Sequence, residues 1–217
     1  MRTTVVGTGF IGGTLGRALA ASGHEVTFAS RNPETDDVAS GTTAQVASVA
    51  NALASGDVII LALPGTAVDE LATEHKGALA GKLVIDATNQ MGAAVDNARG
   101  SLPSDVRYAR AFNTLGGENF AAPVFPDGQR ADLFFSAPEA DRKTVEEVIS
   151  GVGLRPVYVG DRLTVQVRLK DFYVRRGRSG IPVIYQVSET EIRNQDGELV
   201  VRQINTDAKL PAPVKAS

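Results

Sequence analysis

The sequence predicts an α/β protein with a doubly wound, mostly parallel sheet of the Rossmann type and a C-terminal antiparallel β appendage. In the first 160 residues, short apolar strands alternate with helices, which is typical of a parallel sheet covered on both faces. A glycine-rich turn joins the first strand to the first helix. After residue 162, apolar and polar residues alternate, and no helical pattern is visible. We therefore predict two domains, residues 1–160 and residues 161–217.

The strands of the first domain are expected to be short and rich in aliphatic residues. They are predicted at 3–6, 25–29, 57–63, 83–87, 106–112, 133–136 and 154–159. The segment "DVIILAL" is apolar on both faces, as a central parallel strand covered by helices would be. Gly23 provides the left-handed cap that ends the first helix. The helices are predicted at 11–21, 44–54, 66–75 and 138–149.

The second domain is predicted to be a set of antiparallel strands. The run "LTVQVRL" places its apolar residues at every second position, as in a strand with one face in water. Further on, "NQDG" separates "IPVIYQVSETEIR" from "ELVVRQI", and turn residues between two β-rich runs predict a hairpin. This apolar hairpin is expected to need a partner, so we predict a homodimer formed through the C-terminal β segment.

The composition is that of a soluble globular protein and limits its partners. Of 217 residues, 43% are hydrophobic and 22% are charged, and the net charge of −3 gives no general attraction to nucleic acid or to anionic membranes. The longest aliphatic run is too short to cross a bilayer. The absence of cysteine excludes disulfides and thiolate metal sites, and the two histidines have no ligand-like neighbours. We expect a cytoplasmic protein that holds no metal ion.

Residues 7–12 form the pattern G-x-G-x-x-G, as Gly7, Thr8, Gly9, Phe10, Ile11 and Gly12. The pattern follows a predicted strand and opens a predicted helix, which is the context of a dinucleotide-binding turn. Gly7 permits the tight turn, Gly9 lets a pyrophosphate approach the backbone, and Gly12 lets the helix pack against the strand. Free N–H groups at the helix start would then face the phosphates. The alternative is a glycine-rich turn that binds nothing.

The end of the second predicted strand carries Ser30, Arg31 and Asn32, where sites for NAD place an acidic residue. An acid would repel a 2′-phosphate, whereas an arginine can bind two of its oxygens with a planar fork. The Ser30 hydroxyl and the Asn32 amide can donate further hydrogen bonds. These residues favour NADP(H) over NAD(H). The alternative is an arginine that is merely solvated in a turn.

Several segments resemble the NADPH-dependent reductases of the deazaflavin coenzyme F-420 and their bacterial relatives. They are "VVGTGFIGGTLGRALAASGHEVTFASRNP", "DVIILALP", "KLVIDATN" and "RAFNTLGGENFAAPVF", in this order within residues 1–160. The resemblance implies a Rossmann domain that binds NADP(H) and transfers hydride between the nicotinamide and a flat acceptor, either coenzyme F-420 or a flavin-like ring. Because hydride would pass directly between two rings, no catalytic acid or base is assigned.

The resemblance also implies roles for individual residues. Thr8, Gly9, Phe10 and Ile11 would contact the pyrophosphate, and Ser30 and Arg31 would bind the 2′-phosphate. Leu63 and Pro64 would line the path to the nicotinamide. Asn89 and Asn113 would lie near the nicotinamide and the acceptor. Family members often carry a lysine shortly after the Ser-Arg pair, where this chain has Thr35, Asp36 and Asp37. This departure weakens the expected grip on a 2′-phosphate.

Asp86 is an acidic residue in an apolar strand, and two roles are open to it. The carboxylate could be held by neighbouring backbone N–H groups, which is the favoured interpretation, or it could transfer a proton.

The C-terminal segment departs from the reductase family, whose members continue with helices. Its strands resemble part of a hot-dog fold, of the kind found in MaoC-like acyl-thioester dehydratases, but the long central helix and an Asp/His pair are missing. Three functions therefore stay open. The first is an NADP(H)-dependent oxidoreductase, the second is a non-catalytic module that binds or senses NADPH, and the third is a fragment related to acyl-thioester dehydratases.

Overall fold

The computed structural model describes residues 1–217 except 90–97, 160–163, 177–181, 194–196, 198 and 210–217. The chain divides into two compact units, Met1–Val159 and Gly160–Ser217, and each is described by itself. Among the described residues, no helix is long and apolar enough to cross a membrane.

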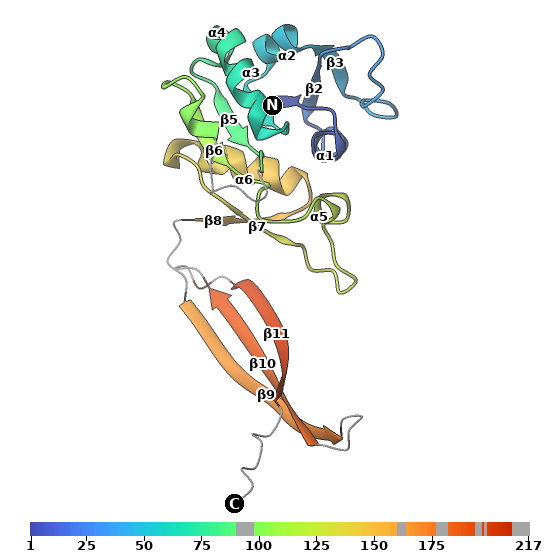
Figure 1. Cartoon of the computed structure of the whole chain (residues 1–217), viewed down its shortest axis with the longest axis vertical. Helices are drawn as coiled ribbons and strands as arrows, with labels where there is room; N and C mark the ends of the chain where they lie inside the picture. Colours follow the sequence, from blue (N-terminus) through green and yellow to red (C-terminus); the bar gives the residue numbers. More distant parts are fainter. Residues whose placement is uncertain (90–97, 160–163, 177–181, 194–196, 198, 210–217) are drawn as a thin grey trace, which may run out of the picture. The chain divides into compact units, whose positions relative to one another are not determined.

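A six-stranded parallel sheet forms the centre of the first unit (Figure 1). Its strand order is β3-β2-β1-β4-β5-β6, which is the order of a Rossmann sheet and confirms the predicted fold class. The strands are β1 (Arg2–Val6), β2 (Glu25–Ser30), β3 (Gln45–Ser48), β4 (Val58–Leu61), β5 (Leu83–Asp86) and β6 (Arg107–Arg110). From β1 the chain adds β2 and β3 on one side of the sheet and then β4, β5 and β6 on the other, and ligands of such sheets bind between β1 and β4, where this order reverses.

Helices cover both faces of the sheet, because alternate residues of each strand point to opposite sides. Val5 packs in one core with α1 (Phe10–Ala21) and α6 (Arg142–Gly151), whereas Val6 packs in a second core with α2 (Val49–Ser55) and α3 (Val68–Glu74). The remaining helices are short. They are η1 (Gly65–Ala67), α4 (Lys76–Leu79), η2 (Ala98–Gly100), α5 (Glu118–Ala121) and η3 (Glu139–Asp141).

The helix predicted at 44–54 is wrong in its first part. Residues Gln45–Ser48 form β3, which pairs in parallel with β2, and α2 begins only at Val49. The sheet edge offers backbone partners that outweigh the modest helical preference of this alanine-containing segment. Ser48 then caps α2 by accepting a hydrogen bond from the Asn51 N–H at 3.4 Å.

Two further strands extend the first unit beyond β6. Strands β7 (Asp132–Phe135) and β8 (Arg155–Tyr158) pair in parallel, with α6 between them in the sequence. An isolated antiparallel bridge between Arg110 and Ser136 connects β6 with the end of β7. The predicted doubly wound sheet is therefore mostly, but not wholly, parallel.

The second unit contains a three-stranded antiparallel sheet in the order β11-β10-β9, as the sequence predicts. Its strands are β9 (Thr164–Arg176), β10 (Pro182–Arg193) and β11 (Leu199–Lys209). The register shifts between Val187 and Ser188 of β10, so that Lys170 of β9 is an additional residue opposite them. Of the predicted turn "NQDG", only Gly197 lies among the described residues.

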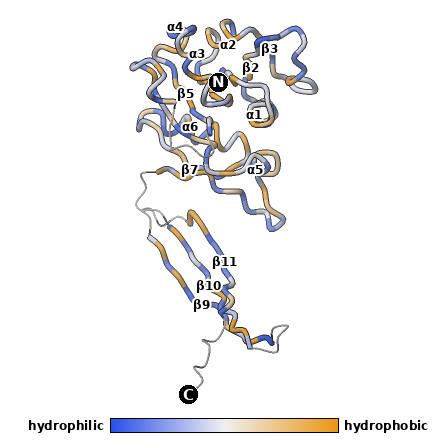
Figure 2. Tube along the Cα trace, in the orientation of Figure 1, coloured by the Kyte–Doolittle hydropathy of each residue, from blue (hydrophilic) through white to orange (hydrophobic). Residues whose placement is uncertain are grey.

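The bulge keeps the apolar residues of β9 on one face of this sheet. They are Val165, Val167 and Leu169 before it and Phe172 and Val174 after it, all of them exposed. Figure 2 shows the alternation of hydrophobic and hydrophilic residues along these strands.

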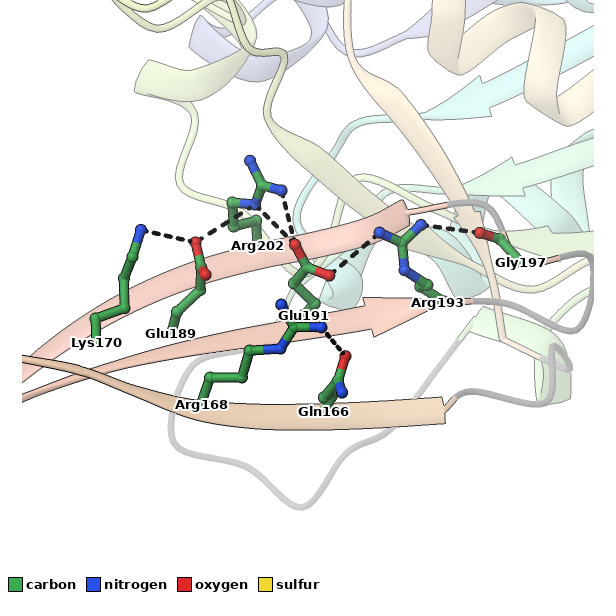
Figure 3. Close-up of polar contacts among 8 residues, drawn as sticks. All are labelled: Gln166, Arg168, Lys170, Glu189, Glu191, Arg193, Gly197 and Arg202. Atoms are coloured by element: carbon green, nitrogen blue, oxygen red, sulfur yellow. Dashed lines mark hydrogen bonds and ion pairs between the residues drawn. The ribbon is translucent and has the colours of Figure 1, made fainter.

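The other face is charged around Glu189 and Glu191 of β10, which lie among cations of the strands (Figure 3), and further along it carries the stacked rings of Tyr173 and Tyr185. Glu191 accepts a hydrogen bond from Arg202 at 2.7 Å, and Glu189 pairs with Lys170 at 3.3 Å. The side chains of Glu189 and Glu191 are 13% and 11% exposed, whereas those of Lys170 and Arg202 are 48% and 44% exposed.

Candidate functional site

A groove of about 720 Å³ lies at the carboxyl ends of β1, β2 and β4. Its volume is within the range of small-molecule and cofactor sites. The end of β1 and the turn after it, from Val6 to Gly9, contribute one part of the lining. The other parts come from the segment after β2 and from the segment after β4 together with α3 as far as His75. The groove therefore occupies the position at which a Rossmann sheet binds its ligand.

The glycine loop has the geometry that its sequence predicts. Gly7 has a φ of +112°, and a Cβ there would lie 2.2 Å from the carbonyl oxygen of Ala62. A Cβ on Gly12 would lie 1.9 Å from the carbonyl oxygen of Gly7, so both residues must lack a side chain. A Cβ on Gly9, by contrast, would meet nothing within 4 Å. The turn is thus closed on the side of the protein and open beside Gly9.

Helix α1 begins directly after Gly9 and presents its free N–H groups at this opening. Gly9 is the N-cap, and its carbonyl accepts a hydrogen bond from the Gly13 N–H at 2.8 Å. No side chain caps the helix start. The first N–H groups of a helix have no partner within the helix and carry partial positive charge. The loop therefore fits a pyrophosphate, as predicted for this motif.

Phe10, Ile11 and Gly12 form the start of α1 beside the groove. Phe10 is 65% exposed, and its ring and the Ile11 side chain lie close to the Cα of Gly117. None of the three residues lines the groove. The predicted contact of Phe10 and Ile11 with a pyrophosphate is thus possible for their N–H groups only.

Ser30, Arg31 and Asn32 line the groove where β2 ends. Ser30 is buried, and its hydroxyl donates a hydrogen bond to Asp36 Oδ2 at 2.7 Å and accepts one from the Asn32 N–H at 3.1 Å. The proton that we expected Ser30 to offer to a ligand is therefore given to Asp36. Arg31 is exposed, and no described residue forms an ion pair with it.

Asp36 is a half-buried carboxylate within the same groove. Besides Ser30, it accepts a hydrogen bond from the Val38 N–H at 3.2 Å. Partial burial acts to raise the pKa of Asp36, but hydrogen bonds from Ser30, Thr8 and Val38 together outweigh it and lower that pKa. The carboxylate is therefore ionised at neutral pH.

Leu63 and Pro64 line the opposite side of the groove, where β4 ends. The Ala62 N–H donates to the Val6 carbonyl at 2.8 Å, which continues the pairing of β4 with β1 up to the glycine loop. The sequence did not point to Glu70, Leu71, Glu74 and His75, which also line the groove. Their positions, 70, 71, 74 and 75, place them on one side of α3. This helical spacing was the only sequence signal that could have indicated a shared lining.

Asn89 and Asn113 lie outside the lining of this groove. Asn89 is exposed after β5, and Asn113 follows β6 and donates through Nδ2 to the Thr88 carbonyl at 2.6 Å. Phe112, directly before it, has a φ of +67°, which is uncommon for a residue other than glycine. These residues mark the carboxyl ends of the next two strands of the sheet.

Asp86 is fully buried at the end of β5 and has several hydrogen-bond donors. They are the N–H and hydroxyl of Thr88 at 2.8 and 2.6 Å, the Ala98 N–H at 3.0 Å, Tyr108 Oη at 2.6 Å and Arg110 Nη1 at 2.9 Å. Burial, and then Asp86 itself, raise the pKa of Tyr108 far above its usual range. This pairing supports the structural role of Asp86, with side chains adding to the expected backbone donors.

Comparison with known families supports the dinucleotide site. Residues 2–90 match the family described as NADP oxidoreductase, coenzyme F-420-dependent. This segment contains the entire groove, from Val6 to His75. Residues 152–203 match a second family, described as the FAS1-like dehydratase domain region. The two resemblances seen in the sequence are therefore confirmed over these residues. Among the described residues, no group of three or more acidic or histidine side chains could hold a metal ion.

Solved structures of low sequence identity share the fold. A provisionally named F-420-dependent NADP-reductase from Arthrobacter sp. FB24 is 22% identical, with a TM-score of 0.62, over 73% of this chain and 84% of that chain. A hypothetical protein from Sinorhizobium meliloti is 24% identical, with the same TM-score and the same coverage. Pyrroline carboxylate reductase from Plasmodium falciparum, solved with NADP bound, is 14% identical, with a TM-score of 0.55, over 73% of this chain and 57% of that chain.

Proposed function

We propose that this protein is an NADP(H)-dependent oxidoreductase that transfers hydride between NADPH and a deazaflavin or flavin-like acceptor. The observation that carries the proposal is the groove beside Gly9 and Arg31, which lies within the segment that matches an NADP oxidoreductase family. An open glycine turn, unpaired helix N–H groups and a free guanidinium are the features that a phosphorylated dinucleotide requires.

Each part of the groove has a task in binding this dinucleotide. The N–H groups at the start of α1 would bind the pyrophosphate, and Arg31 would bind the 2′-phosphate with two parallel hydrogen bonds. Leu63 and Pro64 would hold the chain of the dinucleotide against the sheet. The bound dinucleotide supplies the hydride, whereas the protein orients the reacting rings and keeps water away.

The nature of the acceptor is the finer part of the proposal. Two observations support coenzyme F-420 or a similar ring, namely the description of the matching family and that of the similar Arthrobacter protein. Asn89 and Asn113 follow β5 and β6, at the same edge of the sheet as the groove, and could position the acceptor or the nicotinamide carboxamide.

Two alternative functions remain proposals of lower rank. A module that senses NADPH without turnover would need the same groove, and the β-rich tail favours it because the acceptor site would then be incomplete. An acyl-thioester dehydratase is favoured only by the match over residues 152–203. Both histidines of the chain lie in the first unit, at 24 and 75, so the tail has no histidine for acid–base chemistry.

A titration followed by an activity assay tests the proposal. The purified protein is titrated with NADPH and NADH, oxidised coenzyme F-420 is then added, and its absorbance is followed. We expect NADPH to bind and the absorbance of F-420 to fall. Binding without turnover of F-420 or common flavins would favour the sensing module, and failure to bind either nucleotide would contradict both functions.

The variant Arg31→Ala tests the assigned phosphate contact. Loss of a charge-assisted contact should raise the Kd for NADPH by about tenfold to a hundredfold, because such contacts contribute about 1.5–3 kcal/mol. The Kd for NADH, which lacks the 2′-phosphate, should change much less. Equal losses for both nucleotides would contradict the assignment.

A further inference from the structure

Asp36 and Arg31 place charges of opposite sign in the same part of the groove. Arg31 directly follows β2, and Asp36 lies on the loop after it, yet both line the groove beside Ser30. In sites for NAD, an acid at the end of the second strand accepts a hydrogen bond from the ribose 2′-hydroxyl. The end of β2 has no acid, but the fold brings one back from six residues further along the chain.

The position of this carboxylate is fixed by hydrogen bonds from the protein. Ser30 Oγ donates to Oδ2 at 2.7 Å, and the Val38 N–H donates to Oδ1 at 3.2 Å. The loop that carries Asp36 has further backbone contacts, from Thr35 N to the Asn32 carbonyl at 3.2 Å and from Ser40 N to the Asp37 carbonyl at 2.8 Å. Asp36 is thus a built part of the groove rather than a side chain free to turn into solvent.

We infer that Asp36 is a specificity-determining residue that admits NAD(H) to the site and limits its preference for NADP(H). This inference rests on the proposed dinucleotide function. A carboxylate can accept a hydrogen bond from the 2′-hydroxyl of NADH, whereas it repels the 2′-phosphate of NADPH, which carries nearly two negative charges. It also holds the Ser30 proton that the phosphate would otherwise use. Arg31 and Asp36 therefore act in opposite directions on the choice of dinucleotide.

Ionisation of Asp36 is maintained at the pH of an ordinary binding assay. The hydrogen bonds from Ser30, Thr8 and Val38 lower its pKa in spite of partial burial. The charge of Asp36 therefore opposes the 2′-phosphate throughout the neutral range.

The variant Asp36→Asn, with Glu34→Gln as its matched control, tests this inference. Both changes remove one negative charge from the same loop, but Glu34 is exposed and does not line the groove, whereas Asp36 is held beside Ser30. Calorimetric titration gives the Kd of NADPH and of NADH for each protein, and the ratio of the two is the readout. In Asp36→Asn we expect this ratio to shift toward NADPH by about tenfold, which corresponds to about 1.4 kcal/mol. In Glu34→Gln it should shift by less than about threefold, since water screens an exposed charge.

Three outcomes would overturn the inference or its premise. An unchanged ratio in Asp36→Asn, or equal shifts in both variants, would overturn the role of Asp36. A wild-type protein that discriminates against NADH by more than about a thousandfold would overturn it without any variant, so the test does not depend on the folding of Asp36→Asn. If the wild-type protein binds neither nucleotide, the proposed function itself fails, and this result is distinct from an unchanged ratio.

Discussion

At the scale of single residues, Asp86 shows how a buried charge can connect elements of the sheet. Its carboxylate is fully buried and binds Tyr108 and Arg110 of β6, the Ala98 N–H and the Thr88 that follows β5. The Thr88 carbonyl in turn accepts a hydrogen bond from the amide of Asn113. The two segments on which an acceptor would rest are thus anchored to one carboxylate.

The variant Asp86→Asn should destabilise the protein by about 3 kcal/mol or more, because it leaves the buried end of Arg110 without its counter-charge. Denaturant unfolding measures this change. The control Asp57→Asn breaks an ion pair with Arg2 in which both side chains are more than half exposed, and should leave stability unchanged. Similar losses in both variants would show that burial does not determine the effect.

At the scale of elements, the turn between β1 and α1 combines two requirements in neighbouring glycines. Gly12 makes a close approach to the backbone of Gly7, where a Cβ would lie 1.9 Å from the Gly7 carbonyl oxygen. A Cβ on Gly9 would meet nothing within 4 Å, so the described fold does not require a glycine there, and we predict that its task is in ligand binding. Sequence pattern alone assigns both glycines to one motif, but the structure separates their tasks.

Substitution of these glycines by alanine should separate stability from binding. Gly12→Ala places a Cβ against the Gly7 carbonyl and should lower stability by about 2 kcal/mol, as overpacking does. Gly9→Ala should leave the thermal midpoint within experimental error and still weaken NADPH binding at least tenfold, because the new methyl group would occupy the place of the pyrophosphate. Thermal unfolding and calorimetry provide the two readouts. A Gly12→Ala variant as stable as the wild type would contradict the close contact of α1 with the turn.

At the scale of the whole molecule, the second unit leaves an apolar stripe exposed on β9. Val167 and Leu169 are 64% and 61% exposed, and in the described part of the chain β9 pairs with β10 only. An exposed apolar stripe of this kind marks a surface that a partner covers. We propose that a second copy of the chain covers this stripe. Two copies of the stripe can pack face to face about a twofold axis, which makes the contact self-complementary.

Light scattering after size-exclusion chromatography tests this proposal. The wild-type chain should elute as a dimer, and Leu169→Lys should shift it toward the monomer, because the new charge would lie in the apolar contact. Gln166→Lys is the matched control, since it adds the same charge on the polar face of the same strand. A monomeric wild-type protein, or equal shifts in both variants, would contradict the proposed interface.

The sequence by itself determined the succession of strands and helices in the first unit and the place of the glycine loop. Both depend on local properties, namely the apolar period of each segment and the backbone freedom of glycine, and local properties are visible in the chain. The error at 44–54 arose where pairing with the edge of β2 overrode local preference. A helix pattern cannot reveal that a strand edge lies beside it.

Only the tertiary structure decided which side chains share the groove. The sequence placed Ser30 and Arg31 at the end of β2, but it could not show that the loop returns Asp36 to Ser30 or that α3 brings Glu70 and His75 to the same groove. Hydrogen bonds between residues of different segments depend on how the chain folds back, and no local pattern records this. The position of Arg31 follows from the end of its own strand, which the sequence indicates. The position of Asp36 in the groove depends on its hydrogen bond with Ser30, which exists only in the folded chain.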